Sequence, residues 1–179
     1  MRTVACITLL SLLPWPTAQD PAPARAVAAA PARPAVALTG ATSAIENEGY
    51  HRVVDEQSLA RLWLQHRGKP KPDGEYGFFY NDAGVPEVDF ERYEVVAIFG
   101  GTTVNSAGFA VESIADEPRR RLVRFDHRHY QTEGPGGGAQ SAKPFAFFVL
   151  PRTPLPIVLE EDVQGMINQP PQWKERARL

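Results

Sequence analysis

Short apolar runs, each closed by glycine or proline, are the feature of this sequence that most constrains its fold. The clearest run, Val95–Phe99, is followed by a pair of glycines, and a second extends from Phe145 to Leu150. Runs of this length predict buried strands. The step from Asp116 to Arg121 changes from acidic to basic and predicts a charged hairpin turn. Further strands are predicted over Tyr50–Val54, Tyr76–Tyr80, Phe109–Ile114, Arg121–Gln131 and Leu155–Leu159.

One helix is predicted among these strands. Leu59, Leu62 and Trp63 recur at helical spacing, and Asp55 or Ser58 can cap the segment before a glycine and a proline end it. Short strands with a single helix predict a mainly β fold, a compact β-sandwich or barrel-like domain with one covering helix.

The last of these strands contains a proline. Pro156 has no backbone N–H to donate to a neighbouring strand, so its presence predicts that the segment Leu155–Leu159 lies at a sheet edge.

The start of the chain predicts export. Arg2 precedes an apolar run from Val4 to Leu13, which has the length of a secretory signal peptide and is too short to span a bilayer. Residues 1–18 are therefore predicted to be a cleaved signal peptide that leaves no membrane span, with an uncleaved N-terminal anchor as the alternative. The only cysteine, Cys6, lies in this segment, so the mature protein has no thiol for disulfides, cysteine catalysis or metal ligation. The predicted location is periplasmic or secreted, in a bacterium.

Composition divides the rest of the chain into three segments. Residues 19–43 are dominated by proline and alanine and are predicted to form a disordered linker. Residues 44–164 have the size of one ordinary domain. Residues 165–179 are predicted to be a polar tail that frays. With 19 Lys and Arg against 21 Asp and Glu, the chain lacks the basic footprint that nucleic-acid binding requires.

The strand-forming run Thr102–Val111 is broken by Asn-Ser-Ala-Gly. Asn and Gly supply the positive φ that a tight turn needs, so the break is a turn. Alternatively, it is one of the loops with which a rigid sandwich contacts another protein, together with a later run of glycines. On that hypothesis the protein-binding residues are Asn105, Ser106, Ala107, Gly108, Phe109, Gly136, Gly137 and Gly138.

Catalytic and metal sites receive little support from the sequence. His127 and His129 share one face of a strand, a spacing that metal sites use, but a third ligand would have to come from elsewhere. A triad of Ser106, His127 and Asp126 is not expected, because adjacent residues of a strand point to opposite faces. We therefore predict no catalytic residue, no metal and no cofactor, with metal binding by His127 and His129 kept as an alternative.

Several short motifs follow one another in a characteristic order. They are Asp89-Phe90-Glu91, the run Val95–Phe99, Gly108-Phe109, Lys143-Pro144-Phe145 and Val149-Leu150-Pro151-Arg152. Together they resemble the C-terminal domain of the PrcB family of protease complex subunits, over roughly residues 88–159. The resemblance implies a non-catalytic accessory protein that helps to assemble or stabilise a secreted subtilisin-like protease.

A second similarity concerns two loops. The segments Asn105–Phe109 and Gly134–Gly138 are similar to loops of the chagasin-like cysteine protease inhibitors, which are Ig-like sandwiches. The proline and the first threonine of the inhibitors' first loop are absent here. Lys143 also follows the glycines too closely to belong to the inhibitors' third loop. Protease inhibition through the Asn105–Phe109 loop is thus an alternative function.

Overall fold

The computed structural model describes residues 33–69, 84–132, 137–166 and 169–179. The chain divides into two units, Met1–Ala30 and Pro31–Leu179, and every described residue belongs to the second. The predicted signal peptide and the predicted strand Tyr76–Tyr80 lie outside the described residues. Within the described ranges, no helix is long and apolar enough to cross a membrane.

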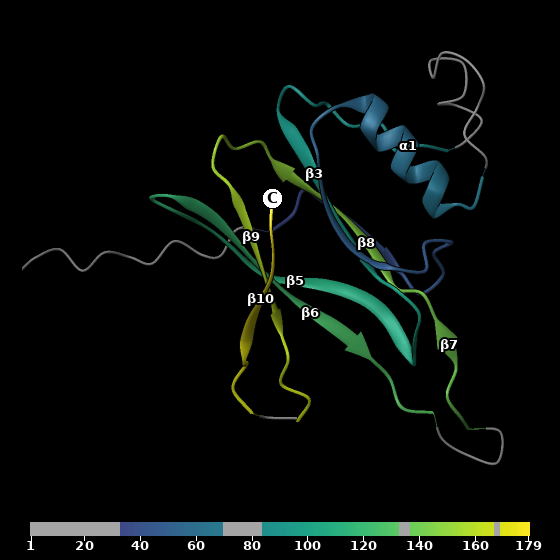
Figure 1. Ribbon diagram of the computed structural model, residues 1–179. Coiled ribbons are helices and arrows are strands. Elements are labelled where there is room, and N and C mark those ends of the chain that lie inside the picture. Colours follow the sequence, from purple (N-terminus) through teal and green to yellow (C-terminus); the bar gives the residue numbers. More distant parts are fainter. Residues whose placement is uncertain (1–32, 70–83, 133–136, 167–168) are drawn as a thin grey trace, which may run out of the picture. The chain divides into compact units, whose positions relative to one another are not determined.

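Strands dominate the second unit, and a single helix accompanies them in its described part (Figure 1). In chain order the elements are β1 (Val36–Gly40), β2 (Glu48–Val53), α1 (Glu56–His66), β3 (Tyr93–Gly100), β4 (Thr103–Val104), β5 (Ser106–Glu117), β6 (Arg120–His129), β7 (Ser141–Ala142), β8 (Phe145–Pro151), β9 (Ile157–Asp162) and β10 (Trp173–Arg178).

The strands form two four-stranded sheets. The first has the order β1-β8-β3-β2 and is antiparallel throughout. The second has the order β10-β9-β6-β5, in which β6 and β9 run parallel and the other pairs are antiparallel. Strands β4 and β7 form a small ribbon. The predicted mainly β fold, a sandwich with one helix, is confirmed, and the described strands do not close into a barrel.

The first sheet is covered on both faces, which explains its continuous apolar strands. Along β3, Val96 and Ile98 face the second sheet, whereas Val95, Ala97 and Phe99 face α1. Strand β8 alternates in the same way between the two cores. A strand buried on both faces must be apolar at consecutive positions rather than at alternate ones. The domain therefore has three layers, namely α1, the first sheet and the second sheet.

Helix α1 has the boundaries that the sequence predicts. The Asp55 side chain accepts a hydrogen bond from the Ser58 backbone N–H at 2.8 Å, so Asp55 is the N-cap. Gly68 adopts a φ of 64° just after the helix, and its N–H bonds the carbonyl of Gln65. Leu59 and Leu62 are buried against the first sheet. The predicted apolar stripe is thus the face that packs on the sheet.

The domain extends further than predicted at both ends. Strand β1 lies within the predicted linker, and β10 lies within the predicted polar tail. Strand β1 is added through main-chain pairing with β8, which requires no large side chains. Strand β10 pairs with β9, and Ala177 and Leu179 pack against the inter-sheet core. The predictions for residues 33–43 and 173–179 were therefore wrong, because composition does not report backbone pairing.

The edge position predicted from Pro156 is also wrong. Strand β9 lies inside the second sheet, between β10 and β6. It begins at Ile157, so Pro156 stands just before the ladder, where its carbonyl accepts from the Arg121 N–H at 2.9 Å. A proline at this position removes no donor from the paired strand.

Candidate functional site

The predicted contact segment Asn105–Phe109 is mostly inside the domain. Ser106 has no exposed surface, and Phe109 is 4% exposed and belongs to the inter-sheet core. Gly108 is buried and Asn105 is half-buried, which leaves Ala107 as the exposed residue of the segment. A partner that approached this segment would meet little besides Ala107.

Asn105 joins the first predicted contact segment to the residues that follow the second. It adopts a φ of 54°, its N–H donates to the Gln140 carbonyl at 2.8 Å, and its side-chain Oδ1 accepts from the Gln140 N–H at 2.8 Å. Gly137 and Gly138 are exposed just before Gln140, whereas Gly136 lies outside the described residues. The asparagine therefore fixes the turn and ties down the segment that follows the glycines.

Gly108 lies where β5 meets β1. It has a φ of 100°, and a Cβ atom there would stand 2.3 Å from Thr39 Oγ1 and 2.9 Å from the Gly40 backbone nitrogen. Thr39 Oγ1 accepts from the Phe109 N–H at 2.9 Å and donates to the Phe145 carbonyl at 3.1 Å. The break in the strand-forming run thus allows a close contact between the two sheets.

Three glycine-to-alanine variants separate the cost of a strained backbone from the cost of a steric clash at this contact. We expect Gly108→Ala to lower the free energy of unfolding by about 2–4 kcal/mol, because it combines a strained φ with a steric clash. Gly84→Ala has the positive φ but free space around it, and it should cost about 1 kcal/mol. Gly138→Ala has neither constraint and should change stability by less than about 0.5 kcal/mol. Urea unfolding measures all three, and equal losses at Gly108 and Gly84 would contradict the close-contact explanation.

A serine, a histidine and a carboxylate do meet at one end of the inter-sheet core. Ser106 Oγ lies 2.8 Å from His127 Nε2, and His127 Nδ1 lies 3.9 Å from Glu161 Oε1. Glu161 is also paired with Arg176. As expected, Asp126 is not the carboxylate beside His127; that residue is Glu161, from β9, the neighbouring strand in the sheet.

The burial of this cluster determines what it can do chemically. Burial, with smaller contributions from His129 and Arg176, lowers the pKa of His127 to about 4, so the ring is neutral at pH 7. A neutral ring can accept the Ser106 hydroxyl proton, as a catalytic histidine does. Ser106, however, has no exposed surface, so its hydroxyl is not reachable from solvent, and its Oγ also accepts from the Gly108 N–H at 3.1 Å. The cluster therefore satisfies buried polar groups.

The two histidines considered as metal ligands contact each other with tilted rings. The ring centroids of His127 and His129 are 4.0 Å apart. Among the described residues, no group of three or more histidine, cysteine or acidic side chains is arranged to hold a metal ion.

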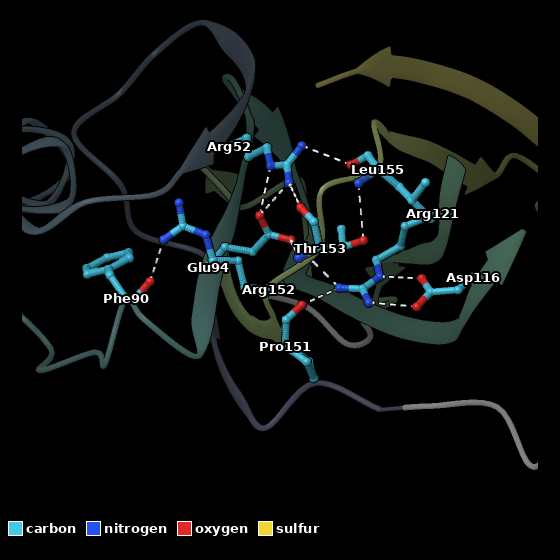
Figure 2. A network of polar contacts seen from close by, with 9 residues as sticks. All are labelled: Arg52, Phe90, Glu94, Asp116, Arg121, Pro151, Arg152, Thr153 and Leu155. Carbon is cyan, nitrogen blue, oxygen red and sulfur yellow. Dashed lines mark hydrogen bonds and ion pairs between the residues drawn. The ribbon is translucent and has the colours of Figure 1, made fainter. Parts of the chain in front are cut away.

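The start of β3 carries a buried carboxylate that the composition and spacing of the sequence did not indicate. Glu94 has no exposed surface, and Arg52 of β2 and Arg121 of β6 approach it in Figure 2. Arg52 Nη2 lies 2.7 Å from Glu94 Oε2, and Arg121 Nη1 lies 3.7 Å from Glu94 Oε1. The Thr153 N–H also donates to Glu94 Oε1 at 3.2 Å. One carboxylate thus connects both sheets and the connection between β8 and β9.

Arg121 has two further partners besides Glu94. Its guanidinium forms a two-pronged contact with Asp116, at 2.6 and 2.8 Å, and it also donates to the Pro151 carbonyl. The pKa of Asp116 is lowered, chiefly by this hydrogen bonding. The predicted charged hairpin turn is therefore correct in place, and Arg121 at its end is 6% exposed and belongs to the interior.

Neutralising Glu94 tests the importance of this connection. We expect Glu94→Gln to lower the free energy of unfolding by about 3–5 kcal/mol, because it leaves the Arg52 guanidinium without its counter-charge and Arg121 with Asp116 as its acidic partner. The exposed Glu112 of β5 supplies the matched control, and Glu112→Gln should change stability by less than about 0.5 kcal/mol. Denaturant unfolding gives both values. A loss below about 1 kcal/mol for Glu94→Gln would contradict the role assigned to this carboxylate.

Two hollows lie along β2, at the edge of the first sheet. One, of about 390 Å³, is lined by residues of β2 and α1: His51, Arg52, Val53, Ser58, Arg61, Leu62 and Gln65. The other, of about 480 Å³, is lined by Arg52, Val54, Arg152, Thr153 and Pro154. Because Arg52 lines both, the hollows adjoin each other. A third, of about 240 Å³, lies between α1 and residues 85–90 and is lined in part by Glu56 and Glu87.

Comparisons with family models, with curated proteins and with solved structures found no match to this chain. The candidate site is therefore defined from the structure alone. It consists of the edge strand β2 and its two adjoining hollows. The sequence predicted a strand over Tyr50–Val54 and the helix that follows it. Neither pattern indicates that the strand ends its sheet or that the helix lies beside it.

Proposed function

We propose that this chain is a non-catalytic, exported accessory protein that binds another protein, and that its partner is a secreted subtilisin-like protease. The observation that carries the proposal is the unpaired edge of β2 beside a shallow hollow of about 390 Å³. The resemblance to the PrcB family supplies the class of partner. The predicted signal peptide supplies the compartment.

The residues that carry the resemblance mostly lie in the interior. Val95–Phe99, Phe109 and Leu150 are buried core residues, so these motifs support a shared fold more than a shared contact surface. Arg152 differs from them, because it ends the last motif and lines the second hollow. The family resemblance and the candidate docking surface therefore meet at one residue.

The alternatives have less support from the geometry. An inhibitor that used Asn105–Phe109 would need those side chains at its surface, and most of them are buried. Hydrolysis by Ser106 would need a reachable hydroxyl, and Ser106 is fully enclosed. Binding through a sheet edge requires no buried group to become exposed.

Capture from the native compartment tests the proposed function. The full chain, with a tag attached through a flexible C-terminal linker, is expressed for export, and proteins retained from the extracytoplasmic fraction are identified. We expect a subtilisin-like protease to be retained, and its activity or lifetime to rise when purified chain is added. An unrelated exported β-sandwich protein with the same tag serves as the control.

Two results would contradict the proposal. Retention of no protease above the control would remove the accessory function. Retention of a protease whose activity falls on addition of the chain would favour the inhibitor alternative instead.

A further inference from the structure

The four outer edges of the two sheets differ in how well they are protected against further pairing. Strand β10 follows Pro170 and Pro171, contains a register shift and carries the Arg178–Glu175 ion pair on its surface. Strand β5 has two register shifts. Strand β1 approaches β5 at Gly108 and bonds it through Thr39. Prolines, bulges, charges and covering segments are the devices by which proteins block exposed strand edges.

Strand β2 lacks a bulge, a proline and a covering strand in the described part of the chain, and its charged residues are Glu48 and Arg52. It runs in unbroken register with β3 over six residues, from the Glu48–Gly100 pair to the Val53–Val95 pair, and contains no proline. In an antiparallel pair, alternate residues direct N–H and C=O away from the partner strand. No described strand pairs with that side of β2. The edge thus offers a template for one more strand.

The hollow beside this edge has the construction of a peptide groove. Val53 of β2 and Leu62 of α1, which are 3% and 8% exposed, form an apolar floor. Ser58, Arg61 and Gln65 come from successive turns of α1 and provide a polar rim. An extended peptide paired with β2 would direct alternate side chains into this hollow.

The charge of the two adjoining hollows specifies the chemistry of the peptide. Their linings include Arg52, Arg61 and Arg152, and no carboxylate lines either hollow within the described ranges. Arg52 is neutralised by Glu94, whereas Arg61 donates to the Ser58 hydroxyl and Arg152 to the Phe90 carbonyl, both uncharged acceptors. Arg61 also helps to lower the pKa of the nearby Asp55 carboxyl, which offsets part of its charge, whereas Arg152 donates to a neutral carbonyl. The surface is therefore complementary to negative charge.

We propose that an extended acidic segment of a partner protein pairs with the open edge of β2, as an additional strand of the first sheet. Its main chain bonds β2, an apolar side chain covers Val53 and Leu62, and its carboxylates face Arg61 and Arg152. This inference rests on the proposed protein-binding function and specifies the surface and the chemistry of the contact.

Binding of synthetic peptides to the full chain tests the proposal, with fluorescence anisotropy as the measurement. The probe is a fluorescein-labelled octapeptide in which pairs of glutamates alternate with pairs of valines, so that each face of the extended peptide carries both residue types. One control replaces each glutamate by lysine, and the other methylates alternate backbone nitrogens on the edge that would pair with β2. We expect both controls to bind at least about tenfold more weakly than the probe, since one loses the charge complementarity and the other the main-chain hydrogen bonds.

Charge reversal on the protein locates the contact. Arg61→Glu should weaken probe binding about fivefold to tenfold, because it turns an attraction at the rim of the hollow into a repulsion. Arg128→Glu reverses an exposed charge on the second sheet and should leave the affinity within about twofold. Circular dichroism confirms that both variants are folded. Binding should also move the backbone amide NMR signals of β2 more than those of β10.

Several outcomes would overturn the proposal. These are equal binding of the glutamate and lysine peptides, equal losses in the Arg61 and Arg128 variants, or NMR shifts centred on another edge. Failure of the probe to bind would also overturn it, whether because the chain covers its own edge or because two copies pair through β2. Size-exclusion chromatography identifies the last case.

The same variants distinguish this inference from the proposed function. If the chain captures a protease equally well with Arg61→Glu and in the presence of excess probe, the accessory function stands and the β2 contact is wrong. If the probe binds at β2 as expected but no protease is captured, the docking surface stands and the accessory function is wrong.

Discussion

The ion pairs of Glu94 are the interaction on which the arrangement of this domain depends. A fully buried carboxylate is tolerable only when counter-charges and hydrogen bonds surround it, and here Arg52, Arg121 and the Thr153 N–H do so. The two arginines belong to different sheets, so the pairs hold the sheets at one position relative to each other. Arg52 is at the same time a residue of the edge strand. The network that aligns the sandwich therefore also fixes the strand on which we propose that a partner docks.

At the opposite end of the inter-sheet core, buried polar groups are satisfied by a different set of residues. There Ser106 and His127 satisfy each other beside Glu161, and the missing side chain of Gly108 lets β5 approach β1. Residues that suggest catalysis or a contact loop thus serve to close the sandwich. The polar groups at both ends of the core are thus used to hold the sandwich together. The candidate binding surface is instead at β2, where unpaired backbone groups, an apolar floor and arginine side chains occur together.

The sequence predicted those features that depend on local pattern. Continuous apolar runs identified β3 and β8, and helical spacing with a capping aspartate identified α1. Features that depend on pairing between distant segments were not predictable: β1 and β10 are held by their neighbours rather than by their own composition. The candidate site was missed for the same reason. Arg152 is far from Arg52 and Arg61 in the chain, and only the strand order shows that the three lie along one open edge.

Hydrogen exchange of the β2 backbone amides in the free protein tests the central claim most directly, since the claim requires that this edge is unpaired. Amides that bond β3 should be protected, whereas the alternate amides of Glu48–Val53 should exchange orders of magnitude faster, at rates close to those of exposed loops. An alternation of slow and fast amides along β2 is the predicted result. Uniform protection of all six would show that the edge is already covered and would contradict the account.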